Sequence, residues 1–175
     1  MGASEALLPG SVPMTTIRAA SSVMSSDDFR RVHGEAFFLL VGTGESKDDN
    51  IGRSISWDEP SESTDDVGLA VVSARAKAPG RSPFLSIGRG SVCDVVIADT
   101  TVSKLHAFMR ASSPLYELFD AGSHNGTFVD TARVAVRAEG NPTLVKSPAT
   151  VRFGSVTLMF LLADDLRALA RKLGG

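Results

Sequence analysis

The feature that most constrains this chain is a series of short apolar stretches in its second half. Gly, Pro, Asn, Asp or Ser separates each stretch from the next, so turns alternate with segments able to form strands. Many short strands at this spacing predict an all-β sandwich, here with about eleven strands in total. The strands expected in this half span residues 84–87, 95–97, 107–110, 116–120, 127–129, 133–136, 150–153 and 156–162.

Two further strands are expected upstream of this series. Residues 37–41 form a compact apolar run typical of a buried strand, and residues 69–73 predict another. Between them, residues 45–66 hold eight acids against two bases, which indicates a long loop, with at most a weak strand at 55–57. We therefore expect the sandwich to span residues 35–163, with its central part at 84–162.

The two ends of the chain have a different character. Residues 1–34 are rich in Ser, Ala, Pro, Thr and Gly, which predicts a flexible tail, with a possible short helix from Ser25 to Gly34. Residues 164–175 predict an amphipathic helix. Asp164 is a candidate N-cap, and basic residues lie in the last turn before Gly174.

Composition narrows the possible functions. The chain has 175 residues, a formal net charge of −2 and a pI of about 5.9, which argues against a nucleic-acid-binding protein. Cys93 is the only cysteine, so neither an internal disulfide nor a Cys/His metal site is expected. The longest apolar runs are too short to span a bilayer. We expect a soluble cytoplasmic protein that uses no metal, cofactor or membrane.

Three of the loops between the expected strands carry groups suited to a phosphate dianion. The first contains Gly88-Arg89, the second Ser103-Lys104 followed by His106, and the third Asn125-Gly126. A guanidinium offers charge-assisted, bidentate hydrogen bonds, and a hydroxyl and an ammonium add donors. An Asn amide both donates and accepts, so it can hold the backbone of an extended peptide.

This set of motifs resembles the forkhead-associated (FHA) domain family, whose pattern is Gly-Arg, then Ser-x-x-His, then Asn-Gly. The resemblance covers about residues 84–162 and implies an FHA-type β-sandwich that binds phosphothreonine in partner proteins. By this resemblance Arg89 and Ser103 bind the phosphate and Lys104 assists. His124 would line the pocket, and Asn125 would bind the peptide backbone. The resemblance implies supporting roles in the site for Gly88, His106 and Gly126.

Two pocket positions depart from the family pattern. The family often has Arg after the motif serine, where this chain has Lys104, and a lysine lacks the planar fork of donors. The residue before the asparagine is often Thr or Ser, but here it is His124, which could make binding depend on pH. The family also often continues with Asn-Gly, where Asp130-Thr131 follow Val129, at a turn that we expect to lie away from the phosphate.

Several other interpretations compete with phosphothreonine recognition. An FHA-like scaffold could bind partners without phosphate, and a small hydrolase could use Ser103 and His106. Gly42 to Lys47 superficially resembles a nucleotide loop, but Lys47 does not directly follow a glycine as the P-loop requires. Gly52-Arg53 repeats the Gly-Arg signal without a following Ser and His. We expect a binding module and not an enzyme.

The expected partner is a protein or peptide that carries phosphothreonine, made by an upstream serine/threonine kinase. Some members of the family bind their own phosphorylated tail. In this chain Thr15 and Thr16 lie in the expected tail and Thr64 lies in the acidic stretch. These three residues are candidate sites for such self-binding.

Overall fold

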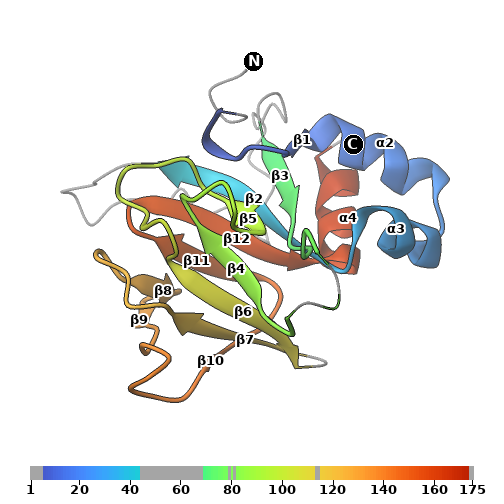
Figure 1. The fold of residues 1–175 in the computed structure, drawn as a ribbon. Coiled ribbons are helices and arrows are strands. Elements are labelled where there is room, and N and C mark those ends of the chain that lie inside the picture. The colour runs from blue at the N-terminus through green and yellow to red at the C-terminus, as the bar shows by residue number, and fades with distance from the viewer. Residues whose placement is uncertain (1–5, 44–68, 79, 81, 113–114, 174–175) are drawn as a thin grey trace.

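The computed structural model describes residues 6–43, 69–78, 80, 82–112 and 115–173, which form two sheets and three helices (Figure 1). In sheet order, the seven-stranded sheet comprises β1 (Val12–Pro13), β3 (Ala70–Ser73), β2 (Ala36–Thr43), β12 (Val156–Leu162), β11 (Ala149–Phe153), β8 (Thr127–Val129) and β9 (Ala132–Arg133). The five-stranded sheet comprises β10 (Thr143–Val145), β7 (Leu115–Asp120), β6 (Ala107–Ser112), β4 (Leu85–Gly88) and β5 (Val95–Val96). The expected all-β sandwich is confirmed.

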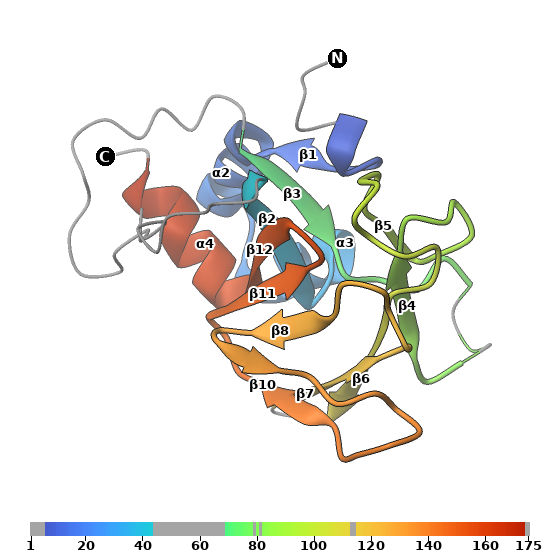
Figure 2. The same ribbon diagram turned by 90° about the vertical axis from the view of Figure 1, so that its left-hand side faces the viewer.

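The main core lies between the two sheets, and a second core lies on the outer face of the seven-stranded sheet (Figure 2). The neighbouring strands β2 and β12 contribute to both. Phe38 and Phe160, whose ring centroids are 5.6 Å apart, face the sandwich interior, whereas Phe37 and Leu161 face the helices. Because side chains alternate between the faces of a strand, a strand covered on both faces needs a continuous apolar run. This explains the unbroken apolar sequences of both strands.

Three helices cover the outer face of the seven-stranded sheet: α2 (Met14–Val23), α3 (Ser26–His33) and α4 (Ala163–Lys172). We call them the helical layer. Their buried side chains include Met14 and Ile17 of α2, Phe29 of α3, and Leu166 and Leu169 of α4. The packing expected for the apolar face of the C-terminal helix is therefore confirmed.

The described part of residues 1–34 is not the flexible tail that its composition predicts. Leu8 is fully buried in the main core, β1 pairs with β3, and α2 and α3 follow directly. The apolar signal in α2 consists chiefly of Met14 and Ile17, one helical turn apart. A helix this weak in sequence is stabilised mainly by tertiary burial, which composition does not reveal.

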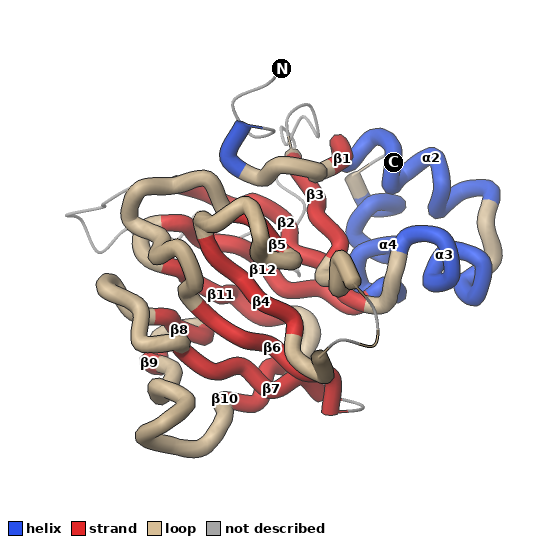
Figure 3. The backbone as a smooth tube through the Cα atoms, viewed as in Figure 1, coloured by secondary structure: helices blue, strands red, loops and turns tan. Residues whose placement is uncertain are grey.

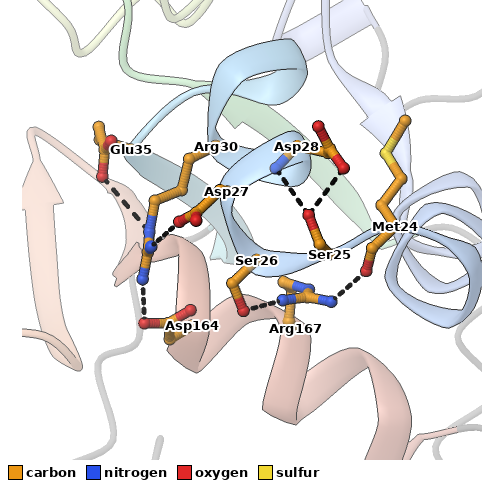
Figure 4. Close-up of polar contacts among 9 residues, drawn as sticks. All are labelled: Met24, Ser25, Ser26, Asp27, Asp28, Arg30, Glu35, Asp164 and Arg167. Atoms are coloured by element: carbon orange, nitrogen blue, oxygen red, sulfur yellow. Dashed lines mark hydrogen bonds and ion pairs between the residues drawn. The ribbon is translucent and has the colours of Figure 1, made fainter.

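The helix boundaries show where local sequence was informative. The short helix expected from Ser25 to Gly34 is confirmed, since the Ser25 side chain accepts a hydrogen bond from the Asp28 N–H and Gly34 ends the helix with φ 113°. The prediction for Asp164 as N-cap is wrong. The cap is Leu162, which makes no side-chain cap bond, and Asp164 lies in the first turn of α4, where it pairs with Arg30 (Figure 4).

A buried arginine joins α4 to the other two helices. Arg167 is 5% exposed, and its guanidinium donates to the Met24 carbonyl at 2.6 Å and to the Ser26 hydroxyl (Figure 4). It also donates to the Ser21 carbonyl at 3.4 Å. The Met24 and Ser21 carbonyls lie at the C-terminal end of α2, where the helix dipole favours a positive charge. Arg167 thus holds the junction between α2 and α3 against α4.

The observed strands follow the expected ones with a few differences. The expected strand 133–136 is reduced to β9 at Ala132–Arg133 plus an isolated bridge between Asp120 and Val136. Strand β10 was not expected, because Pro142 precedes it and only Val145 of its three residues is buried. The weak strand expected at 55–57 lies outside the described residues, as do Gly52-Arg53 and Thr64.

Candidate functional site

The three loops singled out in the sequence meet at one end of the sandwich, which we call the loop end. The Arg89 N–H donates to the Ser103 carbonyl at 2.9 Å, which joins the first loop to the second. The His124 N–H donates to Ser103 Oγ at 3.1 Å, and Asn125 Nδ2 donates to the Thr101 carbonyl at 2.7 Å, which joins the third loop to the second. In Figure 3 these loops lie away from the helical layer.

Gly88 and Gly90 permit the close approach of the first two loops. A Cβ atom on Gly88 would lie 2.5 Å from the Lys104 carbonyl oxygen, and one on Gly90 would lie 2.8 Å from it. Neither glycine has the left-handed φ that would require a glycine for a turn. The supporting role of Gly88 therefore comes from its missing side chain and not from the sharp turn that the sequence suggests.

Arg89 is exposed and only partly engaged. Its Nε donates to the Val102 carbonyl at 3.1 Å, which fixes the plane of the guanidinium and leaves the outer nitrogens facing solvent. No ion pair joins it to a carboxylate of the described residues. An arginine held in this way has donors available for the paired oxygens of an anion.

The Ser103 hydroxyl can donate a hydrogen bond to an acceptor outside its loop. Because its Oγ accepts the His124 N–H, the hydroxyl hydrogen is free to donate elsewhere. His106 contacts Ser103 only through the backbone, where the Ser103 N–H donates to His106 Nδ1 at 3.0 Å. This geometry gives His106 no path to activate the Ser103 hydroxyl.

His106 supports all three loops from the core. It is fully buried, and its Nε2 lies 3.1 Å from the Gly126 carbonyl. Since Nδ1 accepts from Ser103, Nε2 must carry the hydrogen, so the ring is neutral in this arrangement. Burial lowers the pKa of His106, which stabilises this neutral form, although the Gly126 carbonyl acts in the opposite direction. The supporting role expected for His106 agrees with these contacts.

Asp120 organises the third loop, a role that the sequence analysis did not assign. Its carboxylate accepts hydrogen bonds at 2.6–2.8 Å from the Gly122 and Ser123 N–H groups and from the Ser123 and Thr127 hydroxyls. Burial alone would raise the pKa of Asp120, but these hydrogen bonds outweigh it and lower the pKa. The signal was present in the sequence, since Asp followed by Gly and Ser is typical of a side-chain-stabilised turn.

Asn125 lies at the exposed rim of the site and is held by Thr101. Its Nδ2 is used by the Thr101 carbonyl, so its Oδ1 remains to accept an N–H from a bound chain. Thr101 is fixed in turn, because its N–H donates to Asp99 at 2.8 Å and its Oγ1 accepts the Ser155 N–H at 2.9 Å. Sequence reasoning missed Thr101. Gly126 follows with φ +78°, which favours glycine.

The other two predicted residues, Lys104 and His124, are exposed at the same end of the sandwich. The Lys104 carbonyl accepts from the Gly90 N–H at 2.9 Å and the Cys93 thiol at 3.2 Å, and the Lys104 ammonium forms no hydrogen bond or ion pair with the described residues. Cys93 is buried, as expected of a core or loop residue, and burial raises the pKa of its thiol. The structure thus brings all eight predicted site residues together on three connected loops.

Residues 85–154 match the family model of the FHA domain. The match includes every one of the eight predicted site residues. Within the described residues, no helix is long and apolar enough to cross a membrane, and no cluster of three potential metal ligands occurs.

Two bacterial relatives illustrate the similarity. The chain is 32% identical over 98 residues to the oxoglutarate dehydrogenase inhibitor of Corynebacterium diphtheriae. The aligned region covers 54% of this chain and 64% of the relative. It is 36% identical over 81 residues to the glycogen accumulation regulator GarA of Mycolicibacterium smegmatis, with 45% of this chain and 46% of the relative covered. The similarity therefore spans less than two thirds of either relative.

Solved FHA domains are also similar to this chain. The FHA domain of the CT664 protein from Chlamydia trachomatis is 16% identical with a TM-score of 0.46, over 72% of this chain and 96% of that one. The FhaA FHA domain, solved in complex with the intracellular domain of Rv3910, is 20% identical with a TM-score of 0.42, over 71% and 98% of the two chains.

Proposed function

We propose that this protein recognises phosphothreonine in partner proteins, and that it works downstream of a serine/threonine kinase. The observation that carries the proposal is the state of Arg89 and Ser103. Arg89 donates from Nε to the Val102 carbonyl, and its outer nitrogens have no partner among the described residues. The Ser103 oxygen accepts the His124 N–H, so its hydroxyl hydrogen is available to a ligand. These two groups, on adjacent loops, are the donors that a phosphate dianion requires.

The remaining residues have roles that follow from their contacts. Lys104 adds positive charge beside Ser103, and the ring of His124 borders the same loops. Asn125 offers Oδ1 to the ligand backbone while Thr101 holds its amide nitrogen. Gly88, His106 and Gly126 hold the three loops in position relative to one another. The ligand therefore adopts an extended form across the loop end, with its phosphate on Arg89 and Ser103.

The structure favours a partner in another molecule over self-binding through Thr15 or Thr16. Both threonines are exposed, but they lie in α2 between the buried residues Met14 and Ile17. Presenting either threonine in an extended form would unfold the start of α2 and expose these side chains. The relatives named as an inhibitor and a regulator fit a module that acts on separate proteins.

The test is binding of the purified protein to a degenerate phosphothreonine peptide library, with unphosphorylated and phosphoserine libraries alongside. We expect binding that requires phosphothreonine and that Arg89→Ala removes. Arg137→Ala is the matched control, because Arg137 is also exposed but its guanidinium stacks on the rings of Phe84 and Phe108. Binding that is unchanged by phosphate removal would instead support a phosphate-independent scaffold.

A further inference from the structure

Two arginines and a phenylalanine form a row on the outer face of the seven-stranded sheet, beside the loop end. Arg133 of β9 is the cross-strand partner of Phe128 of β8, and Phe128 is the cross-strand partner of Arg152 of β11. The flanking residues Thr127 and Val129 are buried in the sandwich, so Phe128 faces outward. We call these three residues the arginine row.

Both guanidiniums of the row lie against the turns next to Asn125. Arg133 crosses Gly126, since a Cβ on Gly126 would lie 3.3 Å from Arg133 Nε. Arg152 stacks on the Phe128 ring, with Cζ 3.9 Å from the ring centroid, and its Nη1 donates to the Gly154 carbonyl at 2.6 Å. The Gly154 N–H in turn donates to the Gly126 carbonyl at 3.2 Å, so the two turns are adjacent.

The positive charge of the row is not compensated by the described part of the chain. None of the ion pairs between described residues involves Arg133 or Arg152. Asp130, in the turn between β8 and β9, accepts the Thr150 N–H at 3.1 Å, and the nearby Asp99 accepts from Thr101. The Phe128 ring and the Gly154 carbonyl orient Arg152, whereas Arg133 lies over Gly126, and neither guanidinium is ion-paired with a described carboxylate.

We infer that the arginine row selects phosphothreonine ligands that carry acidic side chains on the Asn125 side of the phosphothreonine. This inference rests on the proposed function, because it assumes that Asn125 holds the ligand backbone. A chain bound there continues past Gly126 onto the row. Asp or Glu would then meet two guanidiniums, of which Arg152 is held by Phe128 and Gly154, whereas Lys or Arg would be repelled.

The experiment measures the affinity of the full chain for one phosphothreonine peptide with Ala at every other variable position, and for peptides in which Asp, Ala or Lys replaces each of these in turn. We expect one or more positions on a single side of the phosphothreonine where Asp binds about threefold to tenfold more tightly than Ala, as for partly exposed charge pairs. The preference should weaken as salt is raised.

Variants of the row separate its role from folding. Arg133→Gln with Arg152→Gln should remove the Asp preference and keep phosphothreonine-dependent binding of the Ala peptide, whereas the two Lys replacements should retain much of the preference. Arg137→Gln, on the other sheet, should leave it unchanged. If phosphate and Arg89 are required but Asp, Ala and Lys bind equally at every position, the inference is overturned and the proposed function stands. If phosphate is not required at all, both are overturned.

Discussion

The loop end and the helical layer each hold an arginine against backbone carbonyls, but they use its charge in opposite ways. Arg89 gives one nitrogen to the Val102 carbonyl and keeps the others in solvent. Arg167 is buried, and its two outer nitrogens are used by the Ser21 and Met24 carbonyls and the Ser26 hydroxyl. The difference is one of availability: the outer nitrogens of Arg167 are used inside the protein, whereas those of Arg89 have no hydrogen-bond partner among the described residues.

The comparison predicts that changes in the two regions affect different measurements. The largest expected effect is on ligand binding by Arg89→Ala. It should weaken phosphothreonine peptide binding by about 2–5 kcal/mol, the usual cost of removing one partner of a hydrogen-bonded charge pair. Calorimetric titration with a peptide selected from the library measures this change. Thermal unfolding of the same variant should be nearly unchanged, and a large fall in its midpoint would contradict the assignment of Arg89 to recognition.

The converse change is Arg167→Ala in the helical layer. It should lower the free energy of unfolding by about 2–3 kcal/mol, because buried carbonyls lose their donors and α4 loses packing against Phe29. Urea unfolding followed by circular dichroism measures this loss. Peptide affinity of the folded fraction should match that of the unchanged protein. An affinity loss as large as that of Arg89→Ala would show that the two regions are not separable.

A third change, in the third loop, is expected to lower both stability and peptide affinity. Asp120→Asn keeps the size of the side chain but replaces one accepting oxygen by a donor, so some of the four hydrogen bonds to the third loop are lost. We expect about 1–2 kcal/mol less stability and weaker peptide binding through a less ordered Asn125. Asp94→Asn is a useful comparison, because Asp94 also accepts several hydrogen bonds but outside the third loop. If Asp120→Asn changes stability alone, the third loop does not depend on this carboxylate for binding.

The smallest expected effect concerns pH and again belongs to the loop end. Burial lowers the pKa of His106 below its ordinary value of 6.5, so below that pH the unfolded chain binds a proton that the folded chain resists. Stability should therefore fall as the pH drops below about 6.5, by at most about 1.4 kcal/mol per pH unit from this residue. Unfolding measured from pH 8 to pH 5 tests this sign. The slope should diminish in His106→Gln, and an unchanged slope would assign it to other groups.

The site was more predictable from the sequence than its surroundings were. Arg89, Ser103 and Asn125 could be found because their side chains suit a phosphate and a peptide backbone, and because the order of their motifs resembles the FHA pattern. Asp120 and Thr101 were not assigned roles, because their partners are backbone groups and hydroxyls brought close only by folding. Whether the predicted residues bind phosphate stays a prediction.

In the fold too, the elements determined by local sequence were predicted, and those that depend on tertiary packing were missed. The strand at 156–162 was predicted with its observed bounds, because a run of seven mostly apolar residues follows the turn at Gly154-Ser155. The helix α2 was missed, because Met14 and Ile17 give only a faint apolar face and the sheet beneath supplies most of its stability. The cap at Leu162 was also missed, since the chain passes directly from β12 into α4 and leaves no loop for a capping side chain.

The two-sided burial of β2 and β12 has a consequence for cooperativity. Because these strands supply side chains to both cores, neither core can open without exposing the face of a strand that the other core needs. The protein should therefore unfold as one unit, and the helical layer should not detach as an independent foldon. In native-state hydrogen exchange, the amides that pair Phe38 with Phe160 belong to the slowest class, at the junction of the two cores. A ligand at the loop end would then slow amide exchange in the helices as well, through global stability alone.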